Sequence, residues 1–327
     1  RTPQFSIPAG NHPISAEYLA GVKRNYAASR EKARYTKNGN SLYDIPDQSA
    51  LEVTAEERKA RFDSLWARGG LNFLRAYNDL LISEEANAYA AEYVRDRIRE
   101  KVKNPEVAER LLPRDHHIGA KRPCSDTGYY ETYNRDTVRL VSLNETPLVG
   151  ATPTGIETSD AVYDLDAIVL ATGFDALTGS FLNIDPVGRN GRKLSEKWRS
   201  GPVTYLGLMA NGFPNMFMFA GPGSPSVLTN MVMANEQHVE WVTDLLVYMR
   251  SAGHDRIEPT EEAETSWVEH ADSLAQATLY PTAPSWYMGA NVPGKPRVFF
   301  PYVGGLGPYR QRCDAIATAG YEGFELS

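Results

Sequence analysis

The stretch that decides the fold lies at residues 216–226 and reads Met216-Phe217-Met218-Phe219-Ala220-Gly221-Pro222-Gly223-Ser224-Pro225-Ser226. Its apolar first half predicts a buried strand, and the glycines and prolines that follow predict a tight turn. A long helix is expected from there to about Arg250, with one apolar stripe made of Val239, Val242, Leu246 and Met249. Such a turn suits a phosphate group, because backbone N–H groups and the helix dipole favour negative charge. The turn lacks the third glycine of a dinucleotide fingerprint, so a purely structural turn is the alternative.

Outward from this stretch, the chain divides into a helical half and a strand-rich half. Residues 15–112 carry helical signals, and Thr54 with Glu57 forms a capping-box pattern at one helix start. We expect about four or five short helices there, with a loop at 37–48. Short β-rich runs follow at 138–143, near 152–156 and at 167–170, and a further helix is expected at 261–279.

The apolar run at 167–171 has a distinctive end. It stops at Thr172-Gly173-Phe174, which is typical of a strand that is buried on both faces and ends at a ligand crevice. Together with the 216–226 stretch, this run predicts an α/β fold.

Composition excludes several classes of protein. The 327 residues include 34 Lys+Arg and 41 Asp+Glu, a net charge of -7, which argues against a nucleic-acid-binding protein. The region between Arg199 and Glu236 carries no charge, but its prolines and glycines interrupt any membrane span. Cys124 and Cys313 are too few for a disulfide framework or a zinc site, so a reducing cytoplasm is expected.

Few residues stand out as chemical candidates, and each has a plain structural alternative. Lys121-Arg122 places two cations at the edge of a predicted sheet, but Arg122 alternatively pairs with Asp126. Trp286, in a loop flanked by glycine and proline, either stacks on a ligand or anchors its loop. The six histidines show no metal-ligand spacing, and no Gly-x-Ser-x-Gly elbow or redox cysteine pair is present. Metal, hydrolase and disulfide-reductase sites are therefore disfavoured.

Four groups of residues resemble, in order, one family of enzymes. They are Lys121-Arg122 with Tyr129-Tyr130-Glu131 and Tyr133-Asn134-Arg135-Asp136; Ala171-Thr172-Gly173-Phe174-Asp175-Ala176; Gly221-Pro222-Gly223-Ser224-Pro225-Ser226; and Trp286 with Gly289-Ala290-Asn291-Val292-Pro293-Gly294-Lys295. Over essentially the whole chain this order resembles the flavin-dependent Baeyer–Villiger monooxygenases, in particular the phenylacetone, steroid and cyclohexanone monooxygenase branch.

The resemblance implies two Rossmann-like dinucleotide-binding domains, both partial here. Residues 1–12 and 119–165 would belong to the NADPH-binding domain, 13–118 to a helical insertion in it, and 166–327 to the C-terminal half of the FAD-binding domain. No Gly-x-Gly-x-x-Gly follows a strand, and no Trp is followed by Pro as in the linker motif of the family. We therefore expect an N-terminal segment of the same protein to be missing from this chain.

The resemblance also implies the chemistry. Such enzymes use FAD, NADPH and O₂ to insert one oxygen atom next to the carbonyl of a small ketone, giving an ester or lactone. Arg122 matches the active-site arginine that stabilises the C4a-peroxyflavin and the tetrahedral oxyanion. Such an oxyanion needs a fixed cation beside it, in a site that excludes water.

Further matches assign the remaining site residues. Arg1, Thr2 and Lys121 match positions that read the 2′-phosphate of NADPH, Arg122 also contacts that coenzyme, and Trp286 contacts it when its loop closes. Six residues match positions close to the flavin: Thr172, Gly173, Phe174, Asp175, Asn230 and Met231. Ser226, Val227 and Leu228 match a segment that lines the substrate pocket.

Two rivals stay open. One is a flavin monooxygenase that oxygenates nitrogen or sulfur, against which Arg122 argues, because soft nucleophiles form no tetrahedral oxyanion. The other is a non-catalytic fragment that binds no FAD on its own. The leading prediction is a cytoplasmic ketone monooxygenase without nucleic-acid or membrane partners.

Overall fold

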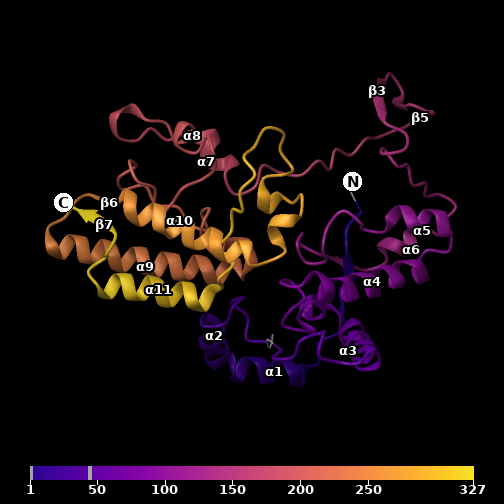
Figure 1. The fold of residues 1–327 in the computed structure, drawn as a ribbon, viewed down its shortest axis with the longest axis horizontal. Helices are drawn as coiled ribbons and strands as arrows, with labels where there is room; N and C mark the ends of the chain where they lie inside the picture. Colours follow the sequence, from indigo (N-terminus) through magenta and orange to yellow (C-terminus); the bar gives the residue numbers. More distant parts are fainter. Residues whose placement is uncertain (1–2, 43–45) are drawn as a thin grey trace.

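The computed structural model of the chain describes residues 3–42 and 46–327. Figure 1 shows helices of the N-terminal third on one side, helices of the C-terminal third on the other, and a small β-meander set apart at one end. Mixed helices and strands confirm the expected α/β class. Arg1 and Thr2 lie outside the described residues, so their predicted role has no structural description.

The N-terminal third is helical, as expected. It comprises α1 (Ala16–Arg24), α2 (Tyr26–Arg34), α3 (Ala55–Arg68), the 3-10 helix η1 (Gly70–Arg75), α4 (Glu84–Lys101) and α5 (Pro105–Leu111). The predicted capping box is confirmed: the Thr54 hydroxyl accepts from the Glu57 N–H at 3.2 Å, and the Glu57 carboxylate accepts from the Thr54 N–H at 2.9 Å. These reciprocal bonds satisfy two N–H groups that the helix leaves without partners.

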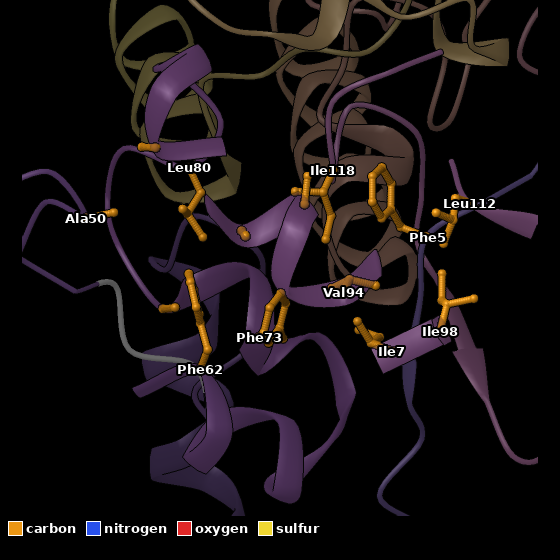
Figure 2. Close-up of a cluster of buried hydrophobic side chains, with 14 of the residues drawn as sticks. Phe5, Ile7, Ala50, Phe62, Phe73, Leu80, Val94, Ile98, Leu112 and Ile118 are labelled. Atoms are coloured by element: carbon orange, nitrogen blue, oxygen red, sulfur yellow. The ribbon is translucent and has the colours of Figure 1, made fainter. Parts of the chain in front are cut away.

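One hydrophobic core binds these helices to the first strand. Phe62 of α3, Phe73 of η1 and Val94 of α4 meet Phe5 and Ile7 there, and all are nearly inaccessible to solvent (Figure 2). Removing this much apolar surface from water is the main stabilising contribution to the helical region. The core therefore fixes the helices against the strand that begins the chain.

Two short strands from either side of the helical region pair with each other. β1 (Ser6–Pro8) runs parallel to β2 (Cys124–Asp126), with Ser6 opposite Cys124, and α6 (Tyr129–Thr132) follows directly. The helical region thus leaves a parallel sheet at β1 and returns to it at β2. This is the connection that an insertion within a dinucleotide-binding domain would have.

The meander consists of β3 (Leu148–Thr152), β4 (Gly155–Thr158) and β5 (Val162–Asp164), paired antiparallel in that order. The β-rich run expected near 152–156 falls partly on these strands, but Pro153 and Thr154 within it form the turn between β3 and β4. The strand expected at 138–143 is wrong, because these residues form no ladder and the Val138 N–H bonds locally to the Arg135 carbonyl at 3.1 Å. The Val138 N–H is therefore used in a local turn and is not available for pairing with a neighbouring strand.

The strand expected at 167–171 is also wrong. The segment is extended but pairs with no described strand, and Val169 and Leu170 are 87% and 81% exposed. A strand buried on both faces needs a neighbouring strand and a packed layer over each face, and the described residues supply neither. The apolar run is therefore left uncovered.

The C-terminal part is mainly helical. Its elements are α7 (Gly179–Ile184), η2 (Arg189–Gly191), α8 (Leu194–Lys197), η3 (Ser226–Leu228), α9 (Met231–Ala252), β6 (Ile257–Pro259), α10 (Glu261–Gln276), η4 (Tyr280–Thr282), η5 (Trp286–Met288), α11 (Leu306–Thr318) and β7 (Phe324–Leu326). β6 and β7 pair antiparallel, and the helix expected at 261–279 is confirmed with an earlier end. None of the helices in the described part of the chain combines the length and the hydropathy that a membrane-spanning helix needs.

Two expectations about the 216–250 region need correction. Residues 216–220 form no strand. The Met218 N–H donates to the Leu208 carbonyl at 2.8 Å, but no regular strand pairing extends from this bond. On α9, Val242 and Met249 are buried as expected, but Val239 and Leu246 are about half exposed. The buried face of α9 is displaced by one position, toward its neighbours His238, Trp241 and Leu245.

Candidate active site

A cavity of about 400 Å³ lies where three parts of the chain meet. The helical region contributes Leu74, the segment after it Arg122, and the C-terminal part Leu228 and Tyr287. Apolar and aromatic side chains predominate, and the polar side chains among them include the cations Lys37 and Arg75, which is compatible with a small-molecule site. The cavity depends on the tertiary fold, since its walls come from segments far apart in sequence.

Arg122 lines this cavity and lacks a described ion-pair partner. Its backbone carbonyl accepts a bond from Gln4 Nε2 at 3.1 Å, which ties the segment to the start of the chain. The expected Arg122–Asp126 pair is wrong: Asp126 accepts from Lys101 Nζ at 2.9 Å and from the Tyr129 N–H at 2.6 Å. The guanidinium is therefore available to a ligand in the cavity.

Tyr287 shows how close Arg122 lies to the aromatic wall. Burial raises the pKa of the Tyr287 hydroxyl to about 12, and the Arg122 guanidinium acts in the opposite direction. Tyr287 is 3% exposed and packs edge to face against Tyr280, with the ring centroids 5.8 Å apart. A neutral phenol and a fixed cation therefore face the cavity together.

Lys121 is held beside the cavity by a carboxylate. Its Nζ lies 3.0 Å from Asp115 Oδ2, and the lysine side chain is only 13% exposed. Lys121 therefore has an ion-pair partner, whereas Arg122 has none among the described residues.

The glycine turn that precedes α9 is packed tightly against other parts of the protein. Gly223 has a φ of +85°, and a Cβ there would lie 2.8 Å from Thr204 Oγ1, so only glycine fits. Ser226 is fully buried with a φ of +42°, and its hydroxyl has no partner among the described residues. Strained backbone and an unsatisfied buried hydroxyl are typical of a ligand site.

The residues that follow this turn reach the cavity in part. Val227 and Leu228 line it, whereas Ser226 does not. Asn230 also lines it and caps α9, accepting from the Val232 N–H at 3.1 Å. Met231, the first residue of α9, is 37% exposed and lies outside the lining.

The remaining predicted residues lie away from the cavity lining. Trp286 is half-buried and packs on Tyr287 with ring centroids 4.3 Å apart, which favours a role in anchoring its loop. Thr172, Gly173 and Phe174 belong to the exposed segment, and Phe174 is 90% exposed. Its carbonyl accepts from Asn291 Nδ2 at 2.8 Å, and Asp175 pairs with Lys295, so this segment is fastened to the Trp286 loop.

Several lining residues were missed by sequence reasoning. Arg75, Tyr280 and Tyr302 line the cavity but belong to segments that the sequence identified only as a helix and an aromatic loop. The aromatic composition of residues 280–309 was the available signal. Among the described residues, no cluster of three or more His, Cys, Asp or Glu side chains that could hold a metal ion is found.

Comparison with known proteins adds independent evidence. No protein-family model matches the chain. The 2-oxo-Delta(3)-4,5,5-trimethylcyclopentenylacetyl-CoA monooxygenase of Pseudomonas putida is 40% identical over 333 residues, covering 100% of this chain and 61% of the relative. Cyclohexanone 1,2-monooxygenase of an Acinetobacter species is 38% identical over 331 residues, covering 100% and 60%. The chain is a homologue of the Baeyer–Villiger monooxygenases.

A phenazine N-monooxygenase of Lysobacter antibioticus is 38% identical to this chain over 330 residues. The match covers 100% of this chain and 60% of the relative. Among solved structures, an oxidised steroid monooxygenase bound to NADP superposes with a TM-score of 0.93 at 49% identity, covering 100% of the chain and 61% of that structure. The chain therefore spans about 60% of the length of the relatives it matches.

Proposed function

We propose that the chain is the greater part of an FAD- and NADPH-dependent monooxygenase that inserts one oxygen atom of O₂ beside a ketone carbonyl. The observation that carries this proposal is Arg122, a guanidinium without a described ion-pair partner, on an apolar and aromatic cavity. Homology to ketone monooxygenases over the whole chain supports the same reaction.

The role of Arg122 follows from its charge and setting. Attack on a ketone carbonyl places negative charge on an oxygen atom, and a fixed guanidinium stabilises that charge before solvent can reorganise. The apolar wall, including Leu74 and Leu228, keeps water away and strengthens the attraction. Arg122 acts without a proton transfer, because a guanidinium stays charged.

The residues present fit the two cofactors. The buried Ser226 hydroxyl, which has no partner among the described residues, and Asn230 at the start of α9 suit a bound ligand, and we assign FAD there. We assign the ammonium of Lys121, which Asp115 holds at 3.0 Å, to the 2′-phosphate of NADPH, and Trp286 to the same coenzyme. When bound, FAD supplies the activated oxygen and NADPH the hydride.

The rest of the proposed FAD-binding domain corresponds to the part of the relatives that this chain does not span. The uncovered apolar run at Val169 and Leu170 supports this, since a segment that paired with it would bury it. We propose a ketone that fits about 400 Å³ as the substrate. A cytoplasmic location remains our proposal, because two cysteines, Cys124 and Cys313, are too few for the disulfide framework of a small secreted domain.

The proposal is tested by supplying the FAD-loaded protein with NADPH, ¹⁸O₂ and a panel of cyclic, aromatic and steroid ketones. We expect esters or lactones that carry one ¹⁸O atom, identified by mass spectrometry. NADPH oxidation that yields only hydrogen peroxide with every ketone would refute it. A preparation that binds no FAD and purifies colourless would instead support the non-catalytic fragment.

Nitrogen oxygenation is the second candidate, favoured by the phenazine N-monooxygenase relative. A nitrogen lone pair attacks oxygen directly and leaves no oxyanion on substrate carbon. An Arg122→Ala variant should therefore retain N-oxide formation but lose ester formation. Adding an aromatic amine or phenazine to the substrate panel separates the two candidates.

A further inference from the structure

Lys121 ends a chain of three polar side chains, of which the proposed function uses only Lys121. Asp115 contacts both of its neighbours: its Oδ2 lies 3.0 Å from Lys121 Nζ, and its Oδ1 lies 2.6 Å from His116 Nδ1. The His116 side chain is 1% exposed and packs edge to face on Phe5. Asp115 is therefore fixed from both sides.

The charges of this chain of side chains follow from its surroundings. Burial lowers the pKa of His116, so the imidazole is neutral and its Nδ1–H donates to Asp115. Burial opposes ionisation of Asp115, but the bonds from His116 and Lys121 outweigh it and lower the pKa of the carboxyl group. At neutral pH the ionised Asp115 carboxylate thus lies 3.0 Å from the Lys121 ammonium.

This arrangement conflicts with the task proposed for Lys121. An ammonium whose charge is neutralised attracts a phosphate weakly, and a dianionic phosphate is repelled by a carboxylate bound to the same lysine. The 2′-phosphate of NADPH must therefore compete with Asp115 for Lys121. NADH carries no such phosphate and meets no such competition.

We propose that Asp115 is a specificity-determining residue that weakens NADPH binding by competing with the 2′-phosphate for Lys121. It acts through Lys121, so it is a positioning residue for the coenzyme site. The inference rests on the proposed assignment of Lys121 to the phosphate. As a consequence of this competition, NADP⁺ dissociates more readily than it would if Lys121 were not paired with Asp115.

The test measures coenzyme binding without any ketone. In the FAD-loaded protein, anaerobic flavin reduction is followed by stopped flow over a range of NADPH and NADH concentrations, which yields a Kd for each. Asp115→Asn keeps the shape and an acceptor for His116 but removes the charge. We expect the Kd for NADPH to fall about ten-fold, the scale of one screened charge pair near a dianion, with the Kd for NADH unchanged.

A double-mutant cycle shows whether the effect passes through Lys121. In a Lys121→Ala background, Asp115→Asn should no longer change the NADPH Kd. Asp63→Asn is the matched control, because Asp63 pairs with Lys59 at 2.7 Å on the exposed face of α3. Asp115→Glu keeps the charge and should bind NADPH as the wild type does, which separates charge from folding defects.

Three results would overturn the inference. They are an unchanged or raised NADPH Kd in Asp115→Asn, an equal fall for NADH, and an effect that persists without Lys121. If Lys121→Ala itself leaves the NADPH Kd unchanged, the phosphate assignment fails and this inference fails with it. Failure of ketone oxygenation alone leaves the inference standing, since flavin reduction needs no ketone.

Discussion

His238 makes the stability of the C-terminal part depend on pH. The side chain is fully buried, with Nδ1 3.1 Å from the Ala220 nitrogen and Nε2 3.1 Å from Tyr309 Oη. The Tyr309 hydroxyl donates to the Leu206 carbonyl at 2.7 Å, so it accepts from His238 Nε2–H. Nδ1 is then the bare nitrogen that accepts from the Ala220 N–H. Protonation of Nδ1 would make it a donor, so its N–H would face the Ala220 N–H with no acceptor between them.

The expected magnitude follows from the pKa. Burial lowers the pKa of His238 from 6.5 to about 4. The unfolded chain therefore takes up a proton at higher pH than the folded chain, and stability falls as pH drops from about 6.5 toward about 4. A difference of about 2.5 pK units corresponds to about 3 kcal/mol, since one unit is worth about 1.4 kcal/mol. Above pH 7 the group contributes no pH dependence.

The assay is urea denaturation of wild type and His238→Gln at several pH values from 4 to 8. Glutamine does not titrate, so carboxylates and other histidines contribute equally to both proteins. We expect the wild type to lose about 3 kcal/mol more than the variant between pH 7 and pH 4. Parallel stability curves for the two proteins would refute the reasoning.

Three further predictions concern separate parts of the molecule. Thr54→Ala removes the N-cap of α3 and should lower the free energy of unfolding by about 1 kcal/mol in thermal denaturation, with Thr318→Ala as a control outside the caps. Lys197→Met leaves the Glu264 carboxylate buried without its partner at 2.6 Å, so a loss of about 3 kcal/mol is expected, and a loss below about 1 kcal/mol would contradict the account. Lys121→Ala should raise the KM for NADPH far more than that for NADH, and equal changes would remove the phosphate assignment.

Local signals in the sequence predicted local structure well. The Thr54–Glu57 capping box and the long helix after Asn230 were predicted because a cap or a helix needs only residues within a few positions. The α9 stripe was displaced by one position, since several apolar residues of that helix are exposed and periodicity alone did not identify the face that meets the core.

Strands and the cavity were harder to predict, because both depend on distant partners. The run containing Val169 and Leu170 is apolar enough for a central strand, yet it is exposed, since pairing is a property of two segments. Arg122 was a candidate from its charge alone, but its catalytic role was predicted only by resemblance to a family. Arg75 and Tyr280 join it on the cavity through tertiary contacts that no local pattern records.

The central claim is that Arg122 stabilises developing oxyanion charge, and one measurement tests it most directly. In Arg122→Ala, the rate of flavin reduction by NADPH and the rate of ester or lactone formation are measured in the same preparation, with Arg110→Ala as a surface control. The account predicts that reduction continues while product formation falls at least about 10²-fold, the scale of losing one preorganised oxyanion donor. Undiminished ester or lactone formation in Arg122→Ala would contradict it.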